Sequence, residues 1–395
     1  MIARLYLVAS MFFALNLAQT LGLPFANVFE KGLYLLLAAA VLLRRRMDPV
    51  AIALMVATLL LLIVLGALTS FPKFSWVTWL LSLNQFVIIY VLIGFYPSEH
   101  DAETILRASA WLPVACVAAG VIGLVATGHR MVGAEWATGT PRLQGSLIPA
   151  FLSGLSATGV VANLILGLEW RRLRYLALVA IDLVILILAG GRAALAVAAI
   201  VSVALVACSR AIHVRDKLVL LMGGIVVLPV FAAIAIPFAL RRLITSTDNG
   251  RNQMAAYLQT LIDRHPWAGI GFGHQYWQTP QDIVVAVGSA AAHNDFLRLT
   301  VELGAIGAAL FYLSMTVAML RAAARGPAFN VTASAAWIGF LLLSHSDNAL
   351  ATPAYFPLLI VCVLPVPDLA GAKPSRRAML PAVRPTPFAA VAGRG

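Results

Sequence analysis

The chain contains a long uncharged stretch, VAIALMVATLLLLIVLGALTS, at residues 50–70. A helix needs about 20 apolar residues to cross the hydrocarbon core of a bilayer, so this stretch is long enough. The whole chain of 395 residues is similarly apolar, with 61% hydrophobic and only 11% charged residues. A soluble domain carries about 25% charged residues. The composition therefore excludes a cytosolic globular protein, a disordered chain and a disulfide-rich secreted module, and it predicts a membrane protein.

Apolar runs of this kind recur along the chain and predict its fold class. We predict an all-α, polytopic integral membrane protein with about 12 transmembrane helices, because helices satisfy their own backbone hydrogen bonds in lipid. The predicted spans are residues 5–23, 28–43, 50–70, 76–96, 108–127, 147–168, 175–189, 193–209, 218–240, 303–320, 331–345 and 353–367. Residues 1–240 then hold the first nine helices, residues 303–367 hold the last three, and residues 368–395 form a disordered cytoplasmic tail.

The basic residues predict the orientation, because cytoplasmic loops of membrane proteins are enriched in Lys and Arg close to the span ends. Two clusters, Arg44–Arg46 and Arg171–Arg174, lie directly beside predicted spans. Placing both clusters inside puts both termini in the cytoplasm. The net charge of +12 then reflects topology, and no nucleic-acid partner is required to explain it.

Residues 241–302 form a large outside loop between the ninth and tenth predicted spans. A connection of this length is unusual unless it is functional or contains structure of its own. Apolar residues recur with helical spacing between Arg251 and His265, namely Met254, Tyr257, Leu258, Leu261 and Ile262. We therefore predict an amphipathic helix in this loop, lying along the membrane surface.

Two arginines at predicted helix starts are candidates for binding an anion. Gly190-Gly191-Arg192 joins the seventh and eighth spans, and the paired glycines would let the backbone approach a bulky ligand closely. Arg251 follows Asn249-Gly250 at the start of the loop helix, where backbone N–H groups and a guanidinium form a phosphate cradle. The alternatives are an Arg192 that extends to lipid headgroups and an Arg251 that is a plain surface residue.

His293 precedes the tenth span in the run His293-Asn294-Asp295-Phe296-Leu297-Arg298. A helix N-terminus disfavours the cationic ring, so we predict a neutral imidazole near pH 7. A neutral imidazole can accept a proton from a sugar hydroxyl and act as a general base. The alternative is a histidine at a helix end with no chemical role.

Four other polar residues on the predicted outside are candidates for binding substrate: Arg142, Tyr257, Asn294 and Asp347. The sequence contains no D-x-D pair, no H-E-x-x-H and no G-x-x-x-x-G-K-[ST], so we predict no metal and no cofactor. Asp182 lies inside the seventh span, where an ionisable group usually has a partner, and we predict an interhelical hydrogen bond there.

The chain resembles the O-antigen ligase and Wzy-type polymerase superfamily in the order of four short motifs: Gly191-Arg192, Gly250-Arg251 followed by RHPWAGIG at residues 264–271, His293-Asn294-Asp295-Phe296-Leu297, and Glu302-Leu303-Gly304. The resemblance implies a glycosyltransferase of the GT-C type whose donor is a glycan on undecaprenyl diphosphate. It further implies that Arg192 and Arg251 hold the donor diphosphate and that His293 acts on the acceptor hydroxyl.

The resemblance leaves several functions open, and we expect an O-antigen ligase, because only one outside loop is long. Such a ligase transfers the glycan to lipid A-core with inversion, in the bacterial inner membrane and on its periplasmic side. The alternatives are a Wzy-type polymerase, a protein O-glycosyltransferase, or a non-enzyme such as a secondary transporter or lipid flippase. The sequence predicts neither the sugars involved nor the oligomeric state.

Overall fold

The computed structural model describes residues 1–23, 26–134, 139–209, 212–220, 222–223, 251–325 and 330–364, without the side chains of Asn27 and Arg251. The first half contains α1 (Ile2–Ala14), α2 (Leu17–Thr20), α3 (Ala26–Leu43), α4 (Pro49–Leu68), α5 (Trp76–Gly94), α6 (Glu99–Thr127), β1 (Val132–Ala134), β2 (Pro141–Leu143), α7 (Pro149–Leu164), the π-helix η1 (Ile165–Glu169), α8 (Arg174–Ala189) and α9 (Arg192–Cys208). The second half contains α11 (Arg251–Arg264), α12 (Gln275–Gln278), α13 (Gln281–Val287), α14 (Asp295–Ala323), α15 (Val331–Ser346), the short 3₁₀ helix η2 (Pro353–Tyr355) and α16 (Phe356–Val363).

The helices occur where the hydropathy predicts them. Each predicted span except 218–240 coincides with a helix or with two consecutive helices, and residues 218–240 lie almost wholly outside the described residues. Among the described helices, five are long and apolar enough to cross a membrane, namely α4, α5, α6, α7 with η1, and α14. An all-α protein with several potential membrane spans is thus confirmed, while about 12 crossings remains a prediction.

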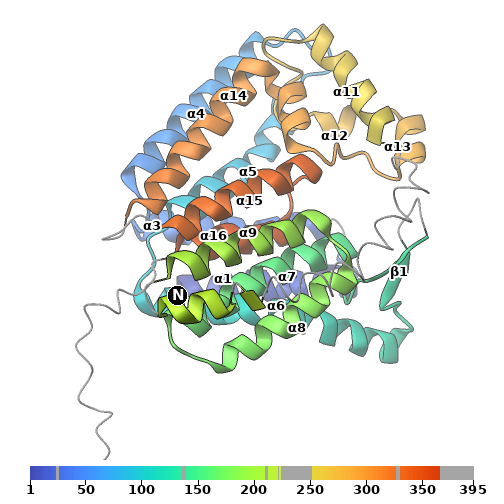
Figure 1. Ribbon diagram of the computed structural model, residues 1–395. Coiled ribbons are helices and arrows are strands. Elements are labelled where there is room, and N and C mark those ends of the chain that lie inside the picture. Colours follow the sequence, from blue (N-terminus) through green and yellow to red (C-terminus); the bar gives the residue numbers. More distant parts are fainter. Residues whose placement is uncertain are drawn as a thin grey trace, which may run out of the picture.

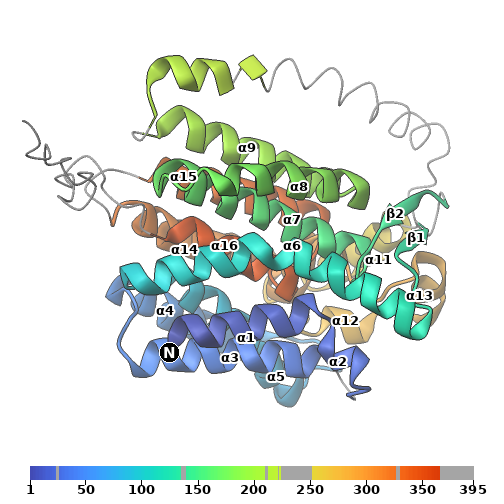
Figure 2. The same ribbon diagram turned by 90° about the horizontal axis from the view of Figure 1, so that it is seen from below.

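The long helices lie side by side, and α11 to α13 lie at one end of this bundle together with β1 and β2, as Figures 1 and 2 show. The first residue lies toward the opposite end. The end with α11 to α13 is called the site end below. The antiparallel pair of β1 and β2, with Gly133 opposite Arg142, was not predicted from the sequence.

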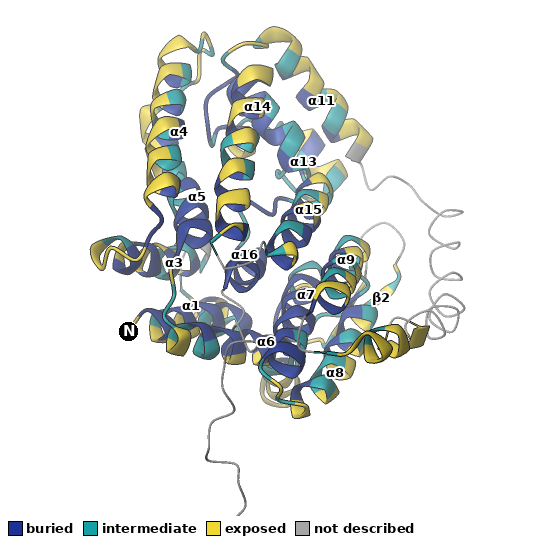
Figure 3. Cartoon of the chain, turned by 60° about the vertical axis from the view of Figure 1, so that its left-hand side comes forward, coloured by how far each residue is buried: buried dark blue, intermediate teal, exposed yellow. Residues whose placement is uncertain are grey.

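Helix α7 lies at the centre of the bundle. Of the most apolar 18 residues in the span formed by α7 and η1, 89% are buried, compared with 22% in α4, and Figure 3 shows the contrast. Its small residues allow this close packing, as is common between helices in membranes: a Cβ at Gly159 would lie 2.5 Å from an Asp182 oxygen on α8. Asn163 of α7 donates a hydrogen bond of 2.7 Å to Asp182, which confirms the predicted interhelical bond.

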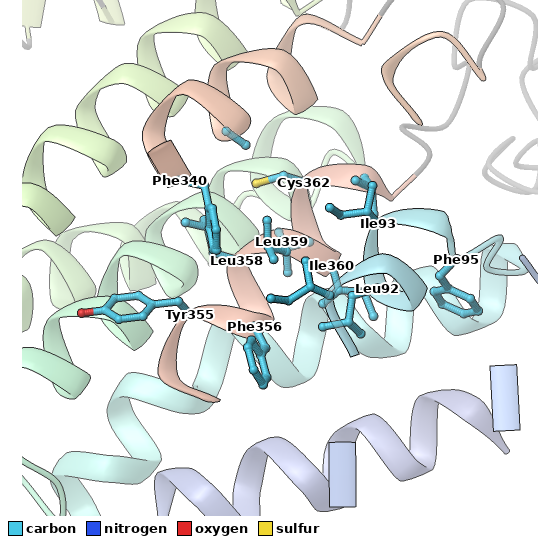
Figure 4. Close-up of a cluster of buried hydrophobic side chains, with 14 of the residues drawn as sticks. Leu92, Ile93, Phe95, Phe340, Tyr355, Phe356, Leu358, Leu359, Ile360 and Cys362 are labelled. Carbon is cyan, nitrogen blue, oxygen red and sulfur yellow. The ribbon is translucent and has the colours of Figure 1, made fainter. Parts of the chain in front are cut away.

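An apolar cluster around α16 forms the core beneath the site end. All eight residues of α16 are buried, and the helix packs against α5, α7 and α15. In Figure 4 the apolar side chains of these helices face one another, whereas Tyr355 lies at the edge of the cluster with its hydroxyl pointing away from it. Because lipid is as apolar as this core, close packing rather than removal from water holds the helices together.

At the opposite end of the bundle, the buried carboxylate of Asp48 connects several helices. Asp48 caps the start of α4 by accepting a hydrogen bond of 2.8 Å from the Val50 N–H. It also forms ion pairs with Arg325 at 3.3 Å and Arg321 at 3.6 Å. Arg325 in turn donates to the backbone oxygens of Phe95 and Ile93 at the end of α5. These contacts hold α4, α5 and the end of α14 together.

Helix α14 is kinked at Gly304, whose φ of 70° is in the left-handed region. A Cβ there would lie 2.2 Å from the Trp267 oxygen, so only glycine allows this approach. The kink frees the carbonyls of Val301 and Glu302, which accept hydrogen bonds of 2.9 Å from the N–H groups of Ile270 and Gly271. Two of the motifs quoted above, residues 264–271 and 302–304, are therefore in direct contact.

The predicted amphipathic helix is confirmed as α11, at Arg251–Arg264. Its apolar residues Met254, Leu258 and Leu261 are buried in a cluster with Ile270 and Val301. This face of α11 is therefore covered by protein, and not left exposed for a membrane surface as we predicted. Residues 241–250 and the predicted tail, 368–395, lie outside the described residues.

The paired glycines before Arg192 fit protein contacts rather than the ligand approach that we predicted. Gly190 ends α8 with a φ of 69°, and a Cβ there would lie 3.2 Å from the Arg142 Nε. At Gly191 a Cβ would lie only 2.4 Å from both the Cβ and the Oγ of Ser153 on α7. The glycines thus let the start of α9 pack directly on the central helix.

The replacement Gly191→Ala should destabilise the protein by about 1–3 kcal/mol, because the added methyl overpacks the contact with Ser153. Adding Ser153→Gly removes both clashing atoms and should restore part of the loss. As a control, Gly32→Ala introduces a methyl that meets nothing within 4 Å. Thermal unfolding of the purified protein in detergent measures the effect, and unfolding of Gly191→Ala at the wild-type temperature would contradict this packing.

Candidate functional site

His293 lies immediately before α14 in a strained backbone conformation, with a φ of 50°. The next residue, Asn294, caps the helix by accepting a hydrogen bond of 3.0 Å from the Leu297 N–H. The structure therefore gives Asn294, a predicted substrate-binding residue, a capping role. Left-handed backbone at a residue other than glycine persists where the surroundings enforce it, and it is common at functional sites.

The nearest charged partner of His293 is Asp347, which was predicted to bind substrate. The Nδ1 of His293 lies 3.3 Å from Oδ1 of Asp347. The two side chains are 36% and 16% exposed, so the pair lies near the surface but the carboxylate is largely sheltered. A carboxylate beside Nδ1 favours the ring tautomer with the proton on Nδ1, which leaves the lone pair of Nε2 free to accept a proton.

Asp347 remains ionised because three donors converge on it. Its Oδ2 accepts a hydrogen bond of 2.6 Å from the Tyr355 hydroxyl, and its Oδ1 accepts one of 2.8 Å from the Asn348 N–H. Burial raises the pKa of the Asp347 carboxyl, but hydrogen bonds from His293 and Tyr355 lower it by more, and the net pKa lies below its usual value. His293 is thus paired with a negative charge.

Tyr355 connects this charged group to the central helix, and it was not among the residues predicted for the site. It ends the short helix η2 at the start of the predicted twelfth span. A Cβ at Gly154 of α7 would lie 2.6 Å from its ring, so the ring lies flush against α7. An aromatic residue at the start of an apolar run looks like an ordinary interfacial anchor, and only the contact with Asp347 shows its place in the site.

A second carboxylate, Asp295, fixes the segments that carry His293 and Asp347. It is fully buried, and its Oδ2 accepts a hydrogen bond of 2.7 Å from the Leu350 N–H. Its Oδ1 pairs with Arg298 of the same helix at 2.8 Å. The start of α14 is thereby bound to the chain that follows α15.

Arg192 begins α9 with an exposed side chain. It has no hydrogen bond and no ion pair within the described part of the chain. Gly191, next to it, packs on Ser153 of α7, while Tyr355 packs on the following residue, Gly154. The backbone before Arg192 and the Tyr355–Asp347–His293 group therefore meet at the same turn of α7.

The other predicted site residues have separate positions. Arg142 on β2 donates from Nε to the Ala189 carbonyl at 2.7 Å, beside Gly190. Tyr257 on α11 donates to the Gln278 carbonyl at 2.5 Å and so holds the outside loop together. Arg251 begins α11, but its side chain lies outside the described residues. The predicted convergence of Arg192, Arg251 and His293 in one cavity therefore remains a prediction.

Replacing Asp347 should affect stability in a pH-dependent way. The folded pKa lies below the usual value of 3.8, so the ionised carboxylate stabilises the fold above that pH, and this contribution is lost as the pH falls through the folded pKa. Asp347→Asn should lower the free energy of unfolding by about 1–3 kcal/mol at pH 7. Unfolding measured from pH 7 to pH 3 should show this difference shrinking at the acid end. The exposed Asp282→Asn is the control, and a difference independent of pH would refute the ionic role.

Comparison with known proteins supports the family suggested by the motifs. Residues 176–312 match the family model described as O-antigen ligase (Wzy_C). A search of curated proteins found no match to the chain. The matched segment spans roughly a third of the chain, from α8 into α14, and it includes Arg192, Arg251 and His293, whereas Asp347 and Tyr355 follow it. Residues 176–312 are therefore similar to the O-antigen ligase family, which covers ligase- and polymerase-type membrane glycosyltransferases.

Proposed function

We propose that the protein is a metal-independent, inverting glycosyltransferase that moves O-antigen glycan from undecaprenyl diphosphate to lipid A-core during lipopolysaccharide biosynthesis. The observation that carries this proposal is the His293–Asp347 pair, 3.3 Å apart. The matched family segment also contains Arg192, which begins α9 and has no partner among the described residues. Transfer of a glycan from a diphosphate carrier requires a base for the acceptor hydroxyl and a cation for the leaving diphosphate.

In this proposal His293 activates the acceptor. Its Nε2 takes the proton from a sugar hydroxyl while the hydroxyl oxygen forms the bond to the anomeric carbon of the donor. Asp347 keeps the proton of the ring on Nδ1 and then stabilises the imidazolium that forms, as a carboxylate does for other catalytic histidines. The bond between the anomeric carbon and the diphosphate oxygen breaks on the opposite face, so the configuration inverts.

The arginines balance the charge of the leaving group. Undecaprenyl diphosphate gains negative charge as its bond to the sugar breaks, and guanidiniums bind phosphate oxygens with paired hydrogen bonds. Arg192 is the first residue of α9 and Arg251 the first residue of α11. Both therefore lie at helix starts, which favour anions.

The same proposal specifies the membrane in which the protein lies and its orientation there. The substrates are lipid-linked, so the site end faces the periplasm from the bacterial inner membrane, with both termini in the cytoplasm as the arginine clusters predict. We propose ligase rather than polymerase because the outside connections predicted from the sequence include only one long loop. A protein O-glycosyltransferase would differ in the acceptor alone.

Purified protein incubated with the lipid-linked glycan should transfer it to lipid A-core and not to a second lipid-linked unit. His293→Ala should lower the transfer rate by roughly 100-fold or more, since a general base contributes about that much. Binding of the donor should persist, because the diphosphate is held by the arginines.

The control is His345→Ala, which removes an exposed histidine from the last turn of α15. Sugar gained by the second lipid-linked unit would identify a polymerase. Full transfer by His293→Ala would rule out the base that we propose.

Arg192→Lys distinguishes a diphosphate clamp from a site that needs only positive charge. Lysine retains the charge but not the planar pair of donors, so we expect roughly 100-fold slower transfer and weaker donor binding. Arg264→Lys, an exposed arginine in the last turn of α11, is the matched control. A transporter or flippase that uses charge alone would tolerate Arg192→Lys, and unchanged turnover would support that class.

A further inference from the structure

A cavity of about 570 Å³ lies at the site end, between the end of α1, the start of α3, the chain before α7 and the chain before η2. This volume is within the range of small-molecule sites, about 300–1,000 Å³. Its polar lining includes Asn16, Gln19, Glu30, Gln144 and Thr352, and its apolar lining includes Phe151. None of the residues proposed to hold the diphosphate lines it.

The lining of the cavity is poorly suited to a phosphate group. It contains no lysine and no arginine, and its ionisable side chains are Glu30 and His129. Phosphate groups in proteins are bound mainly by guanidinium, ammonium or clustered N–H donors. The cavity therefore suits an uncharged polar ligand better than a phosphate.

Glu30 brings a carboxyl group to the cavity that has no protein partner in the described part of the chain. Its side chain lines the cavity, the residue is only 8% exposed, and it has no hydrogen bond and no ion pair within the described residues. A ligand with hydroxyl groups would form hydrogen bonds with this carboxyl group.

The rim of the cavity is rigid, as a binding site requires. Asn16 has a left-handed backbone, with a φ of 52°. It donates to the Ser146 carbonyl at 2.8 Å and to Gln19 Oε1 at 2.9 Å. The rings of Phe13 and Phe151, whose centroids lie 5.8 Å apart, provide an apolar surface on the same wall. Amides, a carboxylate and aromatic rings together suit a sugar, which has polar edges and apolar ring faces.

One wall of the cavity belongs to the same segment as the proposed base pair. Ala351, Thr352 and Pro353 line it, between Asp347 and Tyr355 along the chain. Thr352 donates from its hydroxyl to the Asn348 carbonyl at 2.8 Å, and this bond fixes the segment. A ligand in the cavity therefore sits beside the segment that positions His293.

We propose that this cavity is a subsite for an uncharged sugar residue of the acceptor glycan, with Glu30 accepting hydrogen bonds from its hydroxyls. The inference rests on the proposed function, which identifies the acceptor as a glycan. Binding here would anchor the acceptor while its reactive hydroxyl reaches His293. The donor diphosphate has its own, basic site.

The test compares Glu30→Gln and Ala26→Leu with wild-type protein. Glu30→Gln replaces the carboxyl group with an amide of nearly the same shape, and Ala26→Leu fills the cavity from the wall formed by α3. Both should raise the KM for the acceptor about tenfold and leave the KM for the donor unchanged, because a hydrogen bond of Glu30 is lost or blocked. The matched control is Glu99→Gln, at an exposed glutamate in the first turn of α6.

A binding measurement without donor tests the sugar subsite independently of the proposed transfer activity. Delipidated core oligosaccharide, titrated onto purified protein without donor, should bind the wild type and the Glu99→Gln variant and bind Glu30→Gln about tenfold more weakly. Equal binding by Glu30→Gln, or a higher donor KM in that variant, would overturn the sugar subsite. If the wild type transfers no glycan, the proposed function fails, and the titration still decides whether the cavity binds sugar.

Discussion

The bond between the Asp295 carboxylate and the Leu350 N–H holds together the two segments on which the site is built. Asp295 is fully buried, so its charge depends on this bond and on Arg298. Because Asp295 lies two residues after His293 and Leu350 three residues after Asp347, the bond fixes how the imidazole and its carboxylate face each other. Removing a partner of a buried charge costs more than an ordinary hydrogen bond, so this junction leaves little freedom around the site.

Most of the fold follows from hydropathy, because lipid-facing helices must be apolar over a length set by the bilayer. Some spans were therefore predicted within a few residues, as at 76–96 for α5 and 175–189 for α8, whereas α6 and α14 begin before their predicted spans at 108–127 and 303–320. Contacts at the helix ends were not predictable in this way. Periodicity located α11 but not what covers its apolar face, and the paired glycines indicated a close approach without showing that Ser153 was the neighbour.

The candidate site was predictable only in part. Arg192 was selected because a positive charge at a helix start is costly without a function, and His293 because a helix start keeps its imidazole neutral; both are local signals. The partnership of His293 with Asp347 spans 54 residues, and no spacing rule predicts a contact at that distance. Tyr355 was missed because its sequence context is that of a membrane span, whereas its hydroxyl belongs to the polar group at the end of that span. The convergence of Arg192 and Arg251 stays a prediction, because the side chain of Arg251 lies outside the described residues.

The late position of Asp347 and Tyr355 in the chain also bears on biogenesis. A polytopic protein leaves the ribosome from its N-terminus onward, and His293 emerges well before α15 brings Asp347 into place. Until that penultimate helix is inserted, the imidazole has no carboxylate to orient it. In the mechanism that we propose, a half-made protein that already holds a lipid carrier is therefore unable to activate an acceptor, and only the finished chain acquires the base.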